Sequence, residues 1–215
     1  MPHLQGFHYL TSPAADDRPP LLLLHGSSRD ETELLPLADA AAPDWPYLSL
    51  RGGIPWYGGH AFFRRKPDRS LDRADLAHQT ECLRDFIHAA VETGLIARPP
   101  IVLGFSNGAI IASALLIRDP TCTAGAILIR PLSPDRDADV PPMPGKPILV
   151  LSGDHDDRRV PEDATHIAAQ FEHAGAAVVS HISPTDHHLH PSEAKIIAGW
   201  LETTFFTLVA NDHHR

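Results

Sequence analysis

The residue with the clearest chemical potential is Ser106, which stands between two glycines in the pentapeptide 104–108, GFSNG. Apolar runs lie on both sides, as expected for a turn between a strand and a helix. The order matches G-x-S-x-G, the nucleophile elbow, whose sharp turn lifts a serine hydroxyl above a sheet. A serine that only caps a helix would fit the same position. The flanking pattern favours the nucleophile. The oxyanion that forms when a serine attacks an acyl group would then face the positive end of the helix.

A catalytic serine needs a base and an acid that orients the base, and behind such an elbow the chain order is serine, acid, histidine. Three carboxylates follow the apolar run 147–152, and they are Asp154, Asp156 and Asp157. Three histidines follow the next apolar run, and they are His187, His188 and His190. Turn chemistry alone would explain one or two of the aspartates. The sequence therefore predicts a Ser-Asp-His triad and leaves the choice within each cluster open.

A metal site is the alternative use of the same histidines and aspartates, because imidazole and carboxylate are common metal ligands. Their spacing matches no compact metal motif, and a metal would leave the serine elbow unexplained. We therefore expect neither a metal nor an organic cofactor.

The elements that would position these residues follow from the apolar pattern. Six short apolar runs have the look of strands buried on both faces: 20–25, 46–50, 100–105, 124–129, 147–152 and 177–182. Helical patterns lie between them, over 73–93, over 164–171 and from Pro191 onward. Alternating strands and helices predict an α/β fold with a mostly parallel central sheet and helices on both faces. The proline-rich stretch 131–147 is expected to be a surface loop.

Composition sets the outer bounds. With 215 residues, 43% of them hydrophobic, the chain is expected to form a single domain, 1–215, without length for a large lid. A net charge of -9 counts against a nucleic-acid partner. Two cysteines indicate reduced thiols, and no apolar run approaches the length of a membrane span. We expect a cytoplasmic protein with no membrane partner, and a homodimer stays open.

Segments along most of the chain resemble the phospholipase/carboxylesterase family of α/β-hydrolases, which includes acyl-protein thioesterases and bacterial carboxylesterases. The likeness is greatest to bacterial hydrolases linked to methylhydroquinone resistance. The matching segments are 21–38, 48–53, 58–65, 104–109, 129–134, 151–163 and 186–189. The resemblance implies an α/β-hydrolase fold and a serine carboxylesterase.

The same resemblance implies individual roles. Ser106 would be the nucleophile, Asp156, three residues after Gly153, the acid, and His187 the base. Asp157 has the wrong offset unless the loop slips by one residue. Asp186 replaces the glycine of the family's G-H-x-L motif, so His188 stays an alternative base.

The segment His25-Gly26-Ser27 is similar to the family's oxyanion loop. This implies that the N–H groups of Ser27 and Asn107 stabilise the oxyanion. The alternative for 26–33 is a helix start, with Ser28 and Glu31 at the spacing of a capping box.

Four aromatic residues in a glycine-rich stretch, 52–65, suggest how substrate is held. They are Trp56, Tyr57, Phe62 and Phe63. Either they roof the core or they form an apolar wall for the ester. The second interpretation predicts a small pocket and short-chain or aromatic esters as substrates. An acyl thioesterase is the nearer alternative function, and a non-catalytic binding protein is the more distant one.

Overall fold

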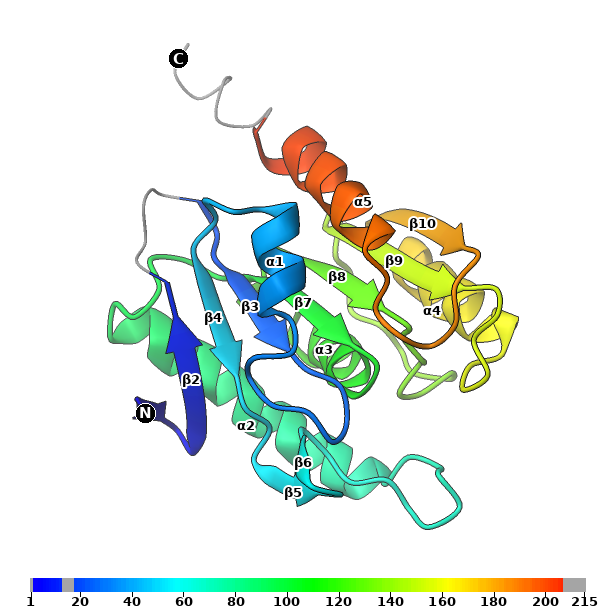
Figure 1. Cartoon of the computed structure of the whole chain (residues 1–215), viewed down its shortest axis with the longest axis horizontal. Coiled ribbons are helices and arrows are strands. Elements are labelled where there is room, and N and C mark those ends of the chain that lie inside the picture. The colour runs from blue at the N-terminus through cyan, green and yellow to red at the C-terminus, as the bar shows by residue number, and fades with distance from the viewer. Residues whose placement is uncertain (1, 13–17, 207–215) are drawn as a thin grey trace.

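The computed structural model describes residues 2–12 and 18–206 and is built around one twisted sheet (Figure 1). The strand order is β1-β2-β4-β3-β7-β8-β9-β10. The strands are β1 (His3–Leu4), β2 (Phe7–Thr11), β3 (Leu21–Leu24), β4 (Tyr47–Leu50), β7 (Ile101–Phe105), β8 (Gly125–Ile129), β9 (Pro147–Gly153) and β10 (Ala177–Ser183). In this order every pair from β4 to β10 is parallel, whereas the pairs β1–β2 and β2–β4 are antiparallel. The predicted mostly parallel sheet is confirmed.

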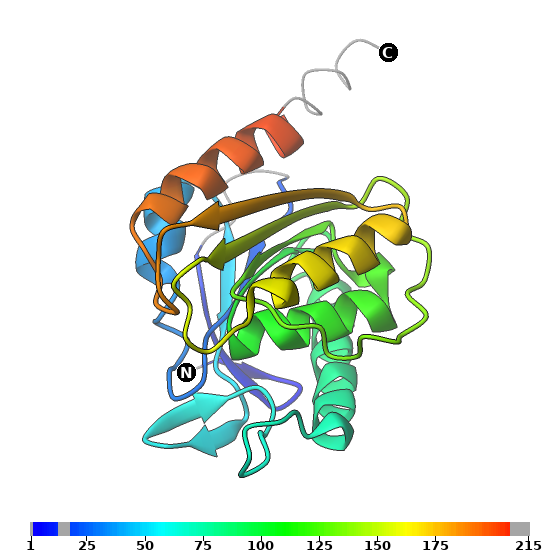
Figure 2. The same ribbon diagram turned by 90° about the vertical axis from the view of Figure 1, so that its right-hand side faces the viewer.

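Helices cover both faces of the sheet (Figure 2). They are α1 (Leu35–Ala41), α2 (Arg73–Glu92), α3 (Asn107–Arg118), α4 (Pro161–His173) and α5 (Ser192–Leu201). A 3₁₀ turn, Pro120–Cys122, and a π-helical turn, Glu202–Phe206, complete the helical segments of the described residues. α1 and α5 pack on one face, and α2, α3 and α4 pack on the other.

Strand β3 shows why the sheet needs two helical layers. Leu22 and Leu24 belong to the core beneath α2, α3 and α4, whereas Leu21 and Leu23 belong to the core beneath α1 and α5. Successive strand residues point to opposite faces, so a continuous apolar run buries both. The four leucines are at most 1% exposed.

Strand β10 departs from the prediction. It pairs only with β9 and forms the edge of the sheet, and Val179 and Ile182 are 50% and 66% exposed. The apolar run 177–182 was therefore correctly placed as a strand, but the expectation of burial on both faces is wrong. An edge strand lacks the second neighbour that would help to cover it.

Two further segments differ from expectation. Turns are formed by residues 27–28 and 31–34, and α1 begins only at Leu35, so a capping box of Ser28 and Glu31 is wrong. The stretch 52–65 contains a small hairpin of β5 (Ile54–Trp56) and β6 (Gly59–Ala61). The stretch 131–147 is a loop up to β9, as predicted. No helix of the described residues has the length and apolar character needed to cross a membrane.

Candidate active site

Ser106 sits at the sharp turn between β7 and α3, with φ 50° and ψ −103°. This strained conformation needs close support from the neighbouring glycines. A Cβ on Gly104 would lie 2.5 Å from the carbonyl oxygen of Gly108, and one on Gly108 would lie 2.0 Å from that of Leu24. The glycines of the motif are therefore required because β3, β7 and α3 meet without room for side chains.

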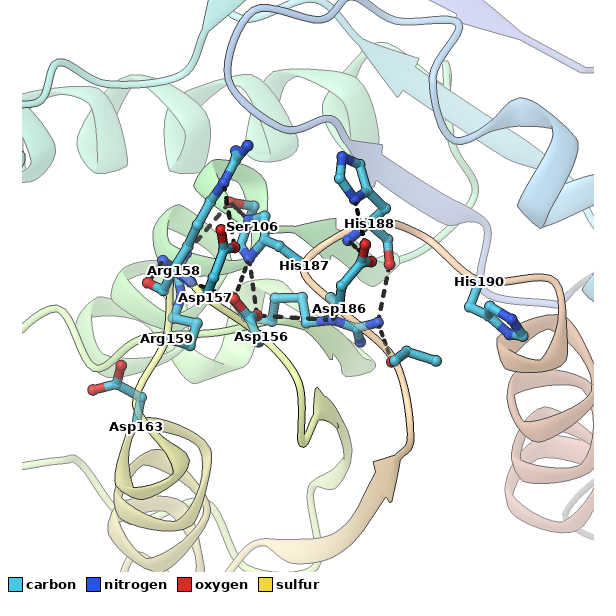
Figure 3. Close-up of polar contacts among 12 residues, drawn as sticks. Ser106, Asp156, Asp157, Arg158, Arg159, Asp163, Asp186, His187, His188 and His190 are labelled. Carbon is cyan, nitrogen blue, oxygen red and sulfur yellow. Dashed lines mark hydrogen bonds and ion pairs between the residues drawn. The ribbon is translucent and has the colours of Figure 1, made fainter.

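The elbow brings the Ser106 hydroxyl to a histidine and a carboxylate from two other loops (Figure 3). Ser106 Oγ lies 2.9 Å from Nε2 of His187. Nδ1 of His187 lies 2.9 Å from both carboxylate oxygens of Asp156. A carboxylate at Nδ1 fixes the proton there and leaves Nε2 free to accept the serine proton. The structure thus brings the three predicted residues together from the ends of β7, β9 and β10.

The surroundings of His187 favour its neutral form. Burial lowers the pKa of the imidazole below its ordinary value, and the charges of Arg159 and Arg158 lower it further. The hydrogen bond to Asp156 acts in the opposite direction. A neutral imidazole near pH 7 is the form that a general base requires.

The geometry distinguishes the alternatives within each cluster. The side chain of Asp156 is 2% exposed, whereas that of Asp157 is 84% exposed. His188 contacts Asp186 with its Nδ1 and points away from Ser106, as Figure 3 shows. Asp157 and His188 therefore have no access to the serine.

The alternative metal site is not assembled. The Nδ1 atom of His190 contacts Ser192, and the other two histidines contact Asp186 and Asp156. Throughout the described residues no group of three histidine, cysteine, aspartate or glutamate side chains could hold a metal ion.

The two residues expected to donate to the oxyanion, Ser27 and Asn107, lie in the loop after β3 and at the start of α3. No acceptor within residues 2–12 and 18–206 takes the backbone N–H of Ser27 or Asn107. The buried side chain of Asn107 has a separate task, because it accepts from the N–H of Phe62 and donates to the carbonyl of Phe63. It ties the 62–63 segment to the elbow.

His25 fixes the loop that carries Ser27. Its Nδ1 donates to the Gly26 carbonyl, and its Nε2 accepts from the N–H of Gly52, at 2.7 and 2.9 Å. Burial lowers the pKa of His25 to about 4, so this ring is neutral and serves as a bridge between the two loops. The next residue, Gly26, donates its N–H to Glu33.

With this geometry established, comparison with known proteins gives the family. A protein of Bacillus subtilis (strain 168) named "Putative hydrolase MhqD" is 34% identical over 181 residues, which cover 84% of this chain and 90% of the relative. The chain belongs to the carboxylesterase-type α/β-hydrolases. No family model matches it. The expected family and enzyme class are confirmed.

Solved structures of two carboxylesterases have the same fold as this hydrolase. The Bacillus cereus carboxylesterase superposes with a TM-score of 0.88 at 30% identity and covers 93% of this chain and 95% of its own. The carboxylesterase from Mesorhizobium loti has a TM-score of 0.80 at 29% identity, covering 86% and 89%.

The aromatic segment of the hydrolase is only partly as expected. Phe62 and Phe63 are 1% and 0% exposed and belong to the core, so the expectation that they line a substrate pocket is wrong. Tyr57 is 87% exposed and forms no enclosed wall. Half-buried Trp56 packs edge-on against Tyr57 and stays the candidate for substrate contact.

One residue that supports the loop of His187 was not predicted from the sequence. Arg130, directly after β8, is fully buried and donates to the carbonyls of Asp186 and His188, to Thr185 and to the carboxylate of Glu193. These bonds hold the loop that carries the base. The available signal was a lone arginine at the end of the apolar run 124–129, within the segment 129–134 that matches the family.

Proposed function

We propose that this hydrolase cleaves carboxylic esters of small molecules through an acyl-enzyme formed on Ser106. The observation that carries the proposal is the continuous hydrogen-bonded chain from Ser106 Oγ through His187 to Asp156, with both links at 2.9 Å. These distances lie within the range of a nucleophile and its general base.

Each residue then has one task in the reaction. His187 takes the proton of Ser106 as the hydroxyl attacks the ester carbonyl, and Asp156 holds the imidazole in the required tautomer. The N–H groups of Ser27 and Asn107 stabilise the oxyanion. His187 passes the proton to the leaving alcohol, and water activated by the same histidine releases the acid.

A fluorophosphonate probe tests the assignment directly. We expect stoichiometric labelling of Ser106, located by mass spectrometry of the labelled peptide, and no labelling of Ser106→Ala. A folded wild-type chain that stays unlabelled would support the binding protein and overturn the proposal. Labelling at another serine would move the active site.

The three residues do not distinguish an esterase from a thioesterase, because a thioesterase would use the same triad. We propose a preference for short-chain or aromatic oxygen esters over thioesters and over long acyl chains, which the small size of a one-domain chain supports. A panel of matched esters and thioesters of graded length tests both preferences by kcat/KM. We also propose a cytoplasmic location, which the free thiols of Cys82 and Cys122 support.

A further inference from the structure

A cationic side chain lies against the nucleophile and has no part in the proposed triad. Arg159, between the loop of the acid and the start of α4, donates from Nη2 to Ser106 Oγ at 3.3 Å (Figure 3). Its Nε donates to the carbonyl of Arg130 at 3.1 Å, and its Nη1 donates to that of Arg158 at 2.9 Å. All three contacts are to neutral oxygens.

Arg159 forms no ion pair with a carboxylate of the described residues. Within the described part of the chain, no aspartate or glutamate oxygen lies within 4.0 Å of its guanidinium. The nearest candidates have other partners, since Asp156 holds His187 and Asp163 pairs with Arg136 at 2.9 Å. Asp163 also accepts the N–H of Val160 at 3.1 Å.

A second half-buried arginine increases the local positive charge. Burial lowers the pKa of Arg159 to about 10, and the charge of Arg65 contributes to this shift. Both guanidinium groups are still protonated near neutral pH. An unpaired and partly desolvated cation is costly for the folded state, and it is the arrangement that binds a carboxylate most strongly.

The contact with Ser106 leaves an N–H available during the reaction. The hydroxyl accepts from Arg159 and donates to His187 in the resting state. Nη2 carries two N–H groups and only one of them donates to Ser106, so the second can bind a group of the substrate. Because Nε and Nη1 already have acceptors, this is a site for one carboxylate.

We propose that Arg159 binds a carboxylate of the substrate and that the enzyme prefers half-esters of short dicarboxylic acids. The proposal rests on the function of Ser106 proposed above. A carboxylate oxygen in hydrogen-bond contact with Nη2 lies within about 6 Å of Ser106 Oγ. That span accommodates two or three methylene groups between the ester carbonyl and the carboxylate.

The reaction balances without a further reactant. The bond from Ser106 Oγ to the acyl carbon forms as the ester C–O bond breaks, and the serine proton leaves with the alcohol through His187. Water then cleaves the acyl-enzyme, which yields the dicarboxylate and restores the serine hydroxyl. Arg159 keeps its proton throughout and holds the distal carboxylate.

The test compares two ethyl esters that differ only in the distal group. Monoethyl glutarate carries a carboxylate there, and the ethyl ester of glutaramic acid carries a neutral amide of nearly the same shape. We expect wild-type kcat/KM to be about tenfold or more higher for the half-ester, as for a hydrogen bond to a charged group. Arg159→Gln should bring the ratio of the two values close to one, mainly through KM, and Arg159→Lys should retain part of the preference. Arg158→Gln is the matched control, because this neighbour is exposed and does not contact Ser106, and it should keep the wild-type ratio.

The outcomes separate this proposal from the function on which it rests. A wild-type enzyme that is labelled at Ser106 and cleaves both esters equally would overturn the carboxylate site and leave the esterase intact. An unchanged ratio in Arg159→Gln would do the same. A chain that is not labelled and cleaves neither ester would overturn the esterase. If the Arg159 variants do not fold, inhibition of the wild-type enzyme tests the proposal instead. Glutarate should inhibit about tenfold or more strongly than its neutral diamide, glutaramide, and equal inhibition by the two would overturn the carboxylate site.

Discussion

At the residue scale, the choice between adjacent histidines is the sharpest consequence of the site. His187→Ala should lower kcat on the order of 10³-fold or more, about as much as Ser106→Ala, because triad members act as a unit. His188→Ala should be mild, since that side chain is 69% exposed and its Nδ1 contacts Asp186 and not Ser106. Steady-state kinetics of both variants, with circular dichroism as the control for folding, check this. A large loss of kcat in His188→Ala but not in His187→Ala would identify His188 as the base.

The same residues set the pH dependence. His187 must be neutral to act, and burial together with Arg159 and Arg158 lowers its pKa, while Asp156 raises it. Replacing Arg159 by Gln removes a nearby positive charge, so the pKa of His187 should rise and the acidic limb of the kcat/KM profile should move to higher pH. Arg159→Lys should leave the limb near its wild-type position. A limb that does not move in Arg159→Gln would show that this charge does not act on the base.

At the element scale, the loop between β10 and α5 depends on Arg130. Arg130→Met would leave the buried carboxylate of Glu193 without its charge partner, at a cost of about 3–5 kcal/mol in unfolding free energy. It would also release the carbonyls of Asp186 and His188, so kcat should fall as His187 loses its position.

A double variant separates these two effects. Arg130→Met with Glu193→Gln removes both buried charges and should recover part of the stability, measured by urea denaturation, while kcat stays low. Turnover that returns together with stability would show that Arg130 has no specific role in holding the loop.

The hairpin β5–β6 is the element expected to influence substrate choice. It lies against the loop after β3, because Arg29 and His60 form a bridge and a Cβ on Gly59 would lie 2.4 Å from the backbone of Ser28. Trp56→Ala should therefore raise KM or change the preferred chain length more than it lowers Tm. Tyr57→Ala, at an 87% exposed position, is the control and should change neither. Early melting of Trp56→Ala with unchanged specificity would assign this side chain to packing.

The apolar pattern of the sequence predicts where strands form, but it does not predict which neighbours a strand or side chain has in the folded protein. Strands such as β3 and β9 are continuous apolar runs, so their burial is encoded locally. The exposure of β10 is not, because an edge strand and a central strand can have the same sequence pattern. Phe62 and Phe63 could not be assigned to core or pocket from the sequence, because the core cluster that contains them is built mostly from segments distant in sequence, such as α2 and α3.

At the scale of the whole molecule, the parallel sheet explains why the proximity of Ser106, Asp156 and His187 could be predicted and the contacts of Arg130 and Arg159 could not. The carboxyl ends of β7, β9 and β10 meet at one edge, so any chemical residue that follows those strands arrives at the same site. Ser106, Asp156 and His187 are separated by 50 and 31 positions but share this edge. Arginines carry no comparable signal, since most are solvated at the surface and only their contacts distinguish these two.

The strain at the elbow gives a prediction for the stability of the entire fold. With φ 50° and ψ −103°, Ser106 adopts a backbone conformation that costs a residue with a Cβ about 1–3 kcal/mol and that glycine adopts more easily. The greater freedom of glycine in the unfolded chain offsets about 0.5–1 kcal/mol of this. The free energy of unfolding of Ser106→Gly, measured by urea denaturation, should therefore be about 1 kcal/mol higher than that of Ser106→Ala. Both variants should lack activity. A lower stability of the glycine variant would show that the surrounding strands, and not strain relief, determine the energetics of this turn.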